Sequence, residues 1–269
     1  MHYEVEVDEE HDEQLANEKI DDEELKDDGD IFLETASSYP KTFYGILATK
    51  KLNRNWEIEW EEPLLTIQNA REISSWQGGI RALALLQLDM KEEASQELKF
   101  LINTANNDLI NAVLAVAEIS NMPHLSINVA NYIKQYADNT TFATCTYPTI
   151  DIELKEGWSV DKALVNALIR QESRFNPKAT SPVGAKGLFQ LMPETAESVG
   201  VTDPYNIDQN IKGGIKYLKW CLNNTDTVEE ALVAYNAGIG NLRKAKKAGK
   251  KIDSITDSFS IFSNNFFLS

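Results

Sequence analysis

The feature that most constrains the fold is a set of apolar residues spaced three and four positions apart, repeated along the chain. This spacing matches the 3.6-residue period of an amphipathic α-helix. Four such stripes precede residue 137: Ile80, Leu83, Leu86 and Met90; Ala94, Leu98 and Leu101; Ile110, Val113 and Ala117; Leu125, Val129 and Tyr132. No segment alternates long enough to indicate a strand. We therefore expect a mainly α protein, with residues 31–137 forming a solenoid-like domain of stacked helical hairpins.

Negative charge is concentrated at the N-terminus. Residues 1–30 contain 15 Asp and Glu against 2 Lys, a net −13 of the chain's −16. Acidic runs of this kind are usually solvated, so we expect an acidic, disordered tail. The remaining chain is nearly neutral and has no basic stripe, which argues against a nucleic-acid partner.

Membrane and metal signals are also missing from the sequence. No apolar run approaches the ~20 residues of a transmembrane helix, and the first residues lack the pattern of a signal peptide. Cys145 and Cys221 are expected to be free thiols, with Cys221 a small core residue. The three histidines are scattered, and no Cys/His spacing suggests a metal site.

A second helical domain is expected over residues 158–258, after a linker at 138–157. Its first helix has Ser159 as the expected N-cap and ends at Asn176-Pro177. Pro193 and Gly200 bracket a second helix. The other expected signals are a stripe of Ile211, Ile215, Leu218 and Leu222, and a capping box of Thr227 and Glu230.

Glu172 is the leading candidate for a catalytic residue. It follows Leu164 and Leu168 at four-residue steps, so it shares the helix face expected to turn inward. Apolar surroundings disfavour the charged carboxylate and raise its pKa, which would make Glu172 a general acid. The alternative is an exposed helix-end residue, or one that pairs with Arg170 or Arg174.

The loop that follows Glu172 supplies groups suited to a sugar. Gly184 and Gly187 permit a positive φ or a close backbone approach. Ser181 and Gln190 add uncharged hydrogen-bonding groups, and Met192 adds a flexible apolar surface. Further candidates stand on later helices: Tyr217, Tyr235 and Asn236.

Three ordered blocks carry a family resemblance. They are Gln171-Glu172-Ser173-Arg174-Phe175-Asn176-Pro177 with Gly184-Ala185-x-Gly187-Leu188-x-Gln190-Leu191-Met192-Pro193, then Asn210-Ile211-x-x-Gly214 with Tyr217-Leu218, and Ala234-Tyr235-Asn236-Ala237-Gly238. Together they resemble the signature of the soluble lytic murein transglycosylases. The resemblance implies a lysozyme-like catalytic domain behind a helical solenoid, and glycan strands of peptidoglycan as the partner, in the periplasm or cell envelope.

The resemblance also implies the chemistry. Glu172 would be the catalytic acid at the bond between N-acetylmuramic acid and N-acetylglucosamine. Once ionised, it would remove the proton of the muramoyl 6-hydroxyl and so give a 1,6-anhydro product. No metal or cofactor is then needed. Residues that match positions lining or supporting the glycan cleft are Ser181, Gln190, Met192, Tyr217, Tyr235 and Asn236.

Other carboxylates bear on whether the reaction uses water. Ordinary glycosidases need a second carboxylate, and Glu194, Glu197, Asp203 and Asp208 have no obvious inward role in the sequence. The alternatives are a goose-type lysozyme that uses water and a catalytically impaired peptidoglycan-binding remnant. The remnant is considered because residues 259–269 form an atypical C-terminal tail, unlike the segment that closes the family's cleft.

Overall fold

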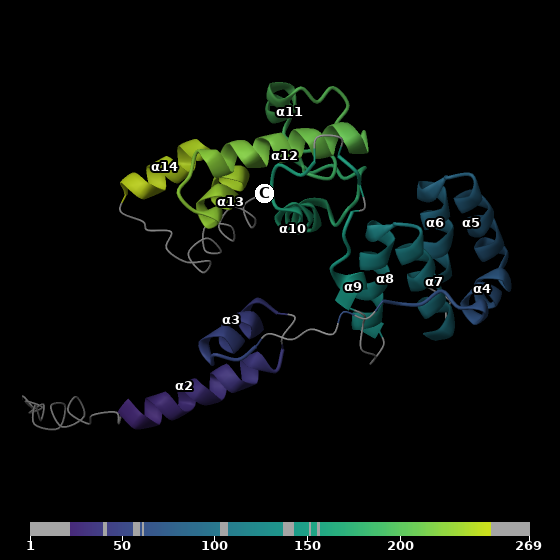
Figure 1. Cartoon of the computed structure of the whole chain (residues 1–269), viewed down its shortest axis with the longest axis horizontal. Coiled ribbons are helices and arrows are strands. Elements are labelled where there is room, and N and C mark those ends of the chain that lie inside the picture. Colours follow the sequence, from purple (N-terminus) through teal and green to yellow (C-terminus); the bar gives the residue numbers. More distant parts are fainter. Residues whose placement is uncertain are drawn as a thin grey trace, which may run out of the picture. The chain divides into compact units, whose positions relative to one another are not determined.

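The computed structural model describes most of the chain and divides it into two compact units, residues 1–60 and 61–269. The described residues are 22–39, 42–55, 60, 62–102, 107–136, 143–150, 152–154 and 157–248. Within them the structure is helical and has no strand, only two isolated bridges in one loop, so the predicted all-α class is confirmed (Figure 1). The expected C-terminal tail, 259–269, lies outside the described residues.

The first unit contains a pair of helices, α2 (Asp22–Ser37) and α3 (Phe43–Lys51), that pack against each other. Thr42 caps α3 by accepting a hydrogen bond from the Gly45 amide. Arg54 donates to Glu34 of α2 at 2.6 Å. The acidic tail was expected to reach residue 30. The structure corrects this for residues 22–30, which belong to α2, and residues 1–21 lie outside the described part.

Six helices open the second unit and share one apolar core. They are α4 (Ile67–Ser74), α5 (Gln77–Gln87), α6 (Lys91–Ile102), α7 (Asn107–Ile119), α8 (Pro123–Tyr136) and α9 (Ala143–Thr146). Helix α7 is buried along most of its length and contacts α4, α6 and α8. The predicted stripes of α6, α7 and α8 all contribute to this core, for example through Leu98, Val113 and Val129. Helix α9 lies inside the predicted linker, as does Ile150, which is buried.

The predicted inward face of α5 is partly wrong. Ile80 is 47% exposed, and Met90 precedes α6 and is also exposed. The fully inward positions of α5 are Gly79 and Ala82. A Cβ on Gly79 would lie 2.0 Å from the carbonyl oxygen of Ile73, so a small residue there permits the tight approach of α4 and α5. Apolar spacing alone does not reveal such a small-residue face.

The catalytic-domain prediction concerns five further helices. They are α10 (Lys162–Ser173), α11 (Pro193–Val199), α12 (Ile207–Asn223), α13 (Val228–Ala237) and α14 (Ile239–Lys247). The long helix α12 contacts α11 and α13, and α13 contacts α14 (Figure 1). Pro193 begins α11 and Gly200, with φ 85°, ends it, as expected. None of the helices in the described ranges is long and apolar enough to cross a membrane.

The predicted start and end of α10 need correction. Asp161, not Ser159, is the N-cap, because its carboxylate accepts a hydrogen bond from the Leu164 amide at 2.9 Å. The helix ends at Ser173, before Asn176-Pro177, since Arg174 adopts a left-handed conformation. The face of α10 is nevertheless as expected, with Leu168 buried in the core of this domain.

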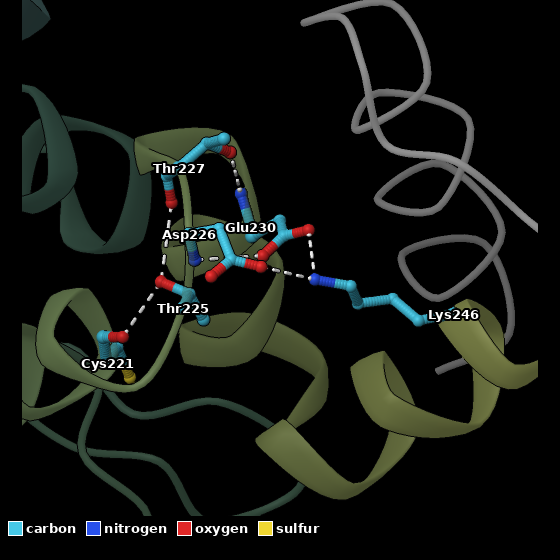
Figure 2. A network of polar contacts seen from close by, with 6 residues as sticks. All are labelled: Cys221, Thr225, Asp226, Thr227, Glu230 and Lys246. Carbon is cyan, nitrogen blue, oxygen red and sulfur yellow. Dashed lines mark hydrogen bonds and ion pairs between the residues drawn. The ribbon is translucent and has the colours of Figure 1, made fainter.

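An ion-pair network fixes α14 beside α13 (Figure 2). Thr227 caps α13 as predicted, and its hydroxyl accepts from the Glu230 amide at 3.2 Å. The buried Glu230 carboxylate does not accept the reciprocal hydrogen bond from the Thr227 amide that would complete a capping box. It accepts instead from the Asp226 amide at 3.1 Å and pairs with Lys246 of α14 at 2.6 Å. Lys246 also pairs with Asp226 at 2.9 Å, so one lysine joins α14 to both acids at the start of α13.

Candidate active site

Glu172 lies in the last turn of α10 and is half-buried. Burial raises the pKa of its carboxyl to about 7. No ion pair to Glu172 occurs among the described residues. Arg170 turns away: its guanidinium donates to the Thr146 carbonyl at 2.9 Å and lies over the Tyr147 ring. The structure therefore disfavours pairing with Arg170 and leaves a carboxyl that is part protonated near neutral pH.

The loop after α10 folds back on itself by backbone hydrogen bonds. Lys186 and Leu191 exchange two bonds of 3.0 Å, and the Gly187 amide donates to the Ala179 carbonyl at 2.9 Å. The Gln190 side-chain amide ties the loop further, donating to the carbonyl oxygens of Ala179 and Gly187. The loop that follows α10 is thus held together by its own hydrogen bonds.

Close packing explains two glycines of the family blocks. Gly187 has φ 78°, and a Cβ there would lie 2.2 Å from the Pro204 carbonyl oxygen. Gly214 of α12 faces the Phe189 ring, whose nearest atom would be 2.1 Å from an added Cβ. Glycine lets the loop and α12 approach this closely.

Buried Asn210 of α12 fastens the same loop. Its side-chain oxygen accepts from the Phe189 amide at 2.9 Å, and its amide nitrogen donates to Pro204 and Lys186 carbonyls. Each buried polar group of this side chain thereby gains a partner. Asn210 belonged to the family blocks but was not predicted to be a site residue.

A cavity of about 460 Å³ lies between this loop, α12 and the end of α13. Five of the seven predicted site residues line it: Gln190, Met192, Tyr217, Tyr235 and Asn236. The rings of Tyr217 and Tyr235 are tilted against each other with centroids 5.1 Å apart, and Tyr217 stacks on Trp220 at 5.9 Å. The cavity therefore combines aromatic faces with amide groups, a composition suited to sugar binding.

Tyr235 connects the cavity to Glu172. Burial raises the pKa of Tyr235 well above its usual value, and the negative charge of Glu172 adds to this effect. The two groups are thus electrostatic neighbours, although Glu172 is not itself among the lining residues. The phenol hydroxyl donates to the Phe189 carbonyl at 2.7 Å.

Ser181 does not line the cavity. Its hydroxyl accepts a hydrogen bond from the Ala185 amide at 3.0 Å, inside the loop. Glu194, by contrast, lines the cavity, although no inward role is predicted for it from the sequence. It is exposed at the start of α11.

Residues 149–257 match the family model described as the transglycosylase SLT domain. The chain is similar to the membrane-bound lytic murein transglycosylase F of Pectobacterium atrosepticum, with 36% identity over 135 residues, 46% of this chain and 28% of that protein. It is also similar to the transglycosylase of Enterobacteria phage PRD1, with 47% identity over 81 residues, 30% of this chain and 31% of that protein. The chain thus spans less than half the length of these curated relatives.

Solved structures share the fold. The 70 kDa soluble lytic transglycosylase of Escherichia coli superposes with a TM-score of 0.71 at 20% identity, covering 89% of this chain and 40% of that one. The lytic transglycosylase Slt of Pseudomonas aeruginosa, an inactive mutant with Gln in place of a Glu, gives a TM-score of 0.57 at 22% identity. That match covers 86% of this chain and 38% of the other.

Proposed function

We propose that the chain cleaves peptidoglycan glycan strands as a lytic transglycosylase, because residues 149–257 match the model of the transglycosylase SLT domain family. The observation that carries the proposal is Glu172, a half-buried carboxyl with a pKa of about 7, whose charge acts on the cavity-lining Tyr235. Because peptidoglycan lies in the cell envelope, we infer that the chain acts in the periplasm.

In the proposed reaction, Glu172 acts first as an acid. The protonated carboxyl gives its proton to the oxygen between N-acetylmuramic acid and N-acetylglucosamine, and the bond from that oxygen to the muramoyl C1 breaks. A carboxyl whose pKa lies near the working pH is suited to this step, because protonated and ionised forms are both well populated.

Glu172 then acts as a base. The carboxylate removes the proton of the muramoyl 6-hydroxyl, whose oxygen forms the new bond to C1. The N-acetylglucosamine side leaves with a 4-hydroxyl, the muramoyl side becomes the 1,6-anhydro sugar, and Glu172 regains its proton. Water is neither consumed nor released, so no second carboxylate is required. The inactive Glu-to-Gln form of the Pseudomonas aeruginosa relative supports an essential Glu in this family.

Binding is proposed to involve the residues around the cavity. Tyr217 and Tyr235 offer ring faces to the sugars, while Gln190 and Asn236 offer amide groups. Met192 is 42% exposed at the rim and gives an adaptable apolar contact. We assign Ser181 a supporting part through its hydrogen bond in the loop.

Two matched variants test the assignment of the acid. Glu172→Gln keeps the shape of the side chain but cannot transfer a proton, so release of glycan from purified sacculi should fall by about 10²-fold or more. Glu194→Gln removes the carboxyl that lines the cavity and should release glycan at nearly the wild-type rate. Loss of activity in Glu194→Gln together with full activity in Glu172→Gln would overturn the assignment.

A further inference from the structure

His124 of α8 forms a hydrogen bond to the end of the helix that carries Glu172. Its Nδ1 lies 2.8 Å from the carbonyl oxygen of Arg174, the residue that follows α10. The Asn128 side chain, one turn further along α8, has its amide nitrogen 3.1 Å from His124 Nε2. Since the carbonyl can only accept and the amide donates, Nδ1 carries the hydrogen and Nε2 accepts.

The acceptor lies in a backbone conformation that needs support. Arg174 has φ 50° and Phe175 has φ 59°, so two successive residues with side chains are left-handed. Such residues persist only where their surroundings hold them. The Arg174 amide still bonds to the Arg170 carbonyl at 3.1 Å, and the Phe175 ring is buried. The Arg174 carbonyl, between the two left-handed residues, is held by His124.

The side of the turn that faces α6 and α8 is not closely packed. A cavity of about 500 Å³ is lined by His124, Met122, Phe175 and Asn176, among others. Side-chain packing therefore leaves this side of the turn partly unsupported. The hydrogen bond from His124 of α8 to the Arg174 carbonyl therefore supports the turn on this side.

Helix α8 is itself firmly placed against this domain. Ile127, which lies on α8 between His124 and Asn128, is 3% exposed and belongs to the same core as Ile169 and Phe175. Burial lowers the pKa of His124 and outweighs the hydrogen bond to the Arg174 backbone, which raises it, while the charges of Lys99 and Arg174 add smaller decreases. The neutral imidazole, with one donor and one acceptor, is thus the favoured form for this bridge.

We propose that His124 is a positioning residue for the reaction: from the preceding helical region it holds the left-handed turn at Arg174 and thereby the direction of Glu172. This inference rests on the proposed function. It gives the helices before residue 137 a part in catalysis, because the end of the catalytic helix depends on a side chain from α8.

Two variants of His124 separate the hydrogen bond from bulk. His124→Asn can place its amide nitrogen where Nδ1 lies and donate to Arg174, whereas His124→Leu has similar size but no donor. With glycan strands as substrate, His124→Leu should lower kcat by about tenfold to a hundredfold with little change in KM. His124→Asn should recover most of kcat. Equal kcat in His124→Leu and wild type, or equal loss in both variants, would overturn the proposal.

Hydrogen exchange tests the same inference without turnover. The Arg174 and Asn176 amides, which bond to Arg170 and Ser173, should exchange faster in His124→Leu than in wild type and His124→Asn. Unchanged exchange in His124→Leu would overturn the positioning role. Failure of the wild-type protein to cleave glycan would overturn the proposed function alone. If His124→Leu does not fold, His124→Ala takes its place: faster exchange and lower kcat than in His124→Asn support the inference, and exchange and kcat equal to those of wild type overturn it.

Discussion

The Tyr235 hydroxyl donates a hydrogen bond of 2.7 Å to the Phe189 carbonyl, joining α13 to the loop that follows α10. Phe189 is fully buried, and its amide is bound by Asn210 of α12. The Phe189 backbone thus donates to a side chain of α12 through its amide and accepts from a side chain of α13 through its carbonyl. These two bonds join the loop to α12 and α13.

Tyr235→Phe should weaken this connection. The variant keeps the ring but leaves the Phe189 carbonyl without its donor, so the free energy of unfolding should fall by about 1 kcal/mol. Tyr205→Phe is the control, because its hydroxyl contacts Thr180 at an exposed position. Urea denaturation of both variants measures the difference. A loss in Tyr235→Phe no larger than in Tyr205→Phe would count against this role.

Glu172 should make stability depend on pH. The carboxyl titrates at about 7 in the folded chain and near its usual value of ~4.3 when unfolded. Between these values the folded state binds more protons, so the free energy of unfolding falls as pH rises.

Glu172→Gln should remove that dependence. At about pH 8 the variant should be more stable than wild type by up to ~3 kcal/mol, and the difference should vanish below about pH 4. Denaturant unfolding of both proteins across this range measures it. A stability difference that is constant with pH would show that Glu172 is not buried as described.

Gly214→Ala should disturb the packing of α12 on the loop. The added Cβ would lie 2.1 Å from the Phe189 ring, so one of them must shift, at a cost of about 1–3 kcal/mol. Gly240→Ala in α14 is a matched control, since no atom lies within 4 Å of its added Cβ. Thermal unfolding should show a clear loss for the first variant and none for the second.

Lys246→Met should loosen α14 (Figure 2). The variant keeps the aliphatic chain but removes the ion pairs to Asp226 and Glu230. Hydrogen bonds to Glu230 and Asp226 hold the pKa of Lys246 above its usual value, so the charged form of the lysine is favoured. The expected result is faster amide exchange in α14, with Lys244→Met as the exposed control. If both variants exchange alike, the network does not fix the helix.

Helical periodicity identified the fold because it depends on neighbours along the chain. The helix faces of α6, α7 and α8 were predicted well, and Pro193 and Gly200 marked the ends of α11. The N-cap of α10 was misplaced because Ser159 and Asp161 are both good capping residues, and only the bond to Leu164 decides between them.

The site was harder to predict because it depends on contacts between distant segments. The spacing of Glu172 suggested an inward face, but its raised pKa follows from burial by other elements. Ser181 accepts a hydrogen bond within its own loop and does not line the cavity, whereas Glu194 does line it. His124 gave no signal at all, because its partner lies 50 residues away.

The account is tested most directly by identifying the new ends that the purified protein creates in sacculi. Mass spectrometry of the released fragments distinguishes a 1,6-anhydro end from a reducing end, because the reducing end contains one more water. The account predicts 1,6-anhydromuramic acid ends with the wild type and neither product with Glu172→Gln. Reducing muramic acid ends would contradict it, since they require water as the nucleophile.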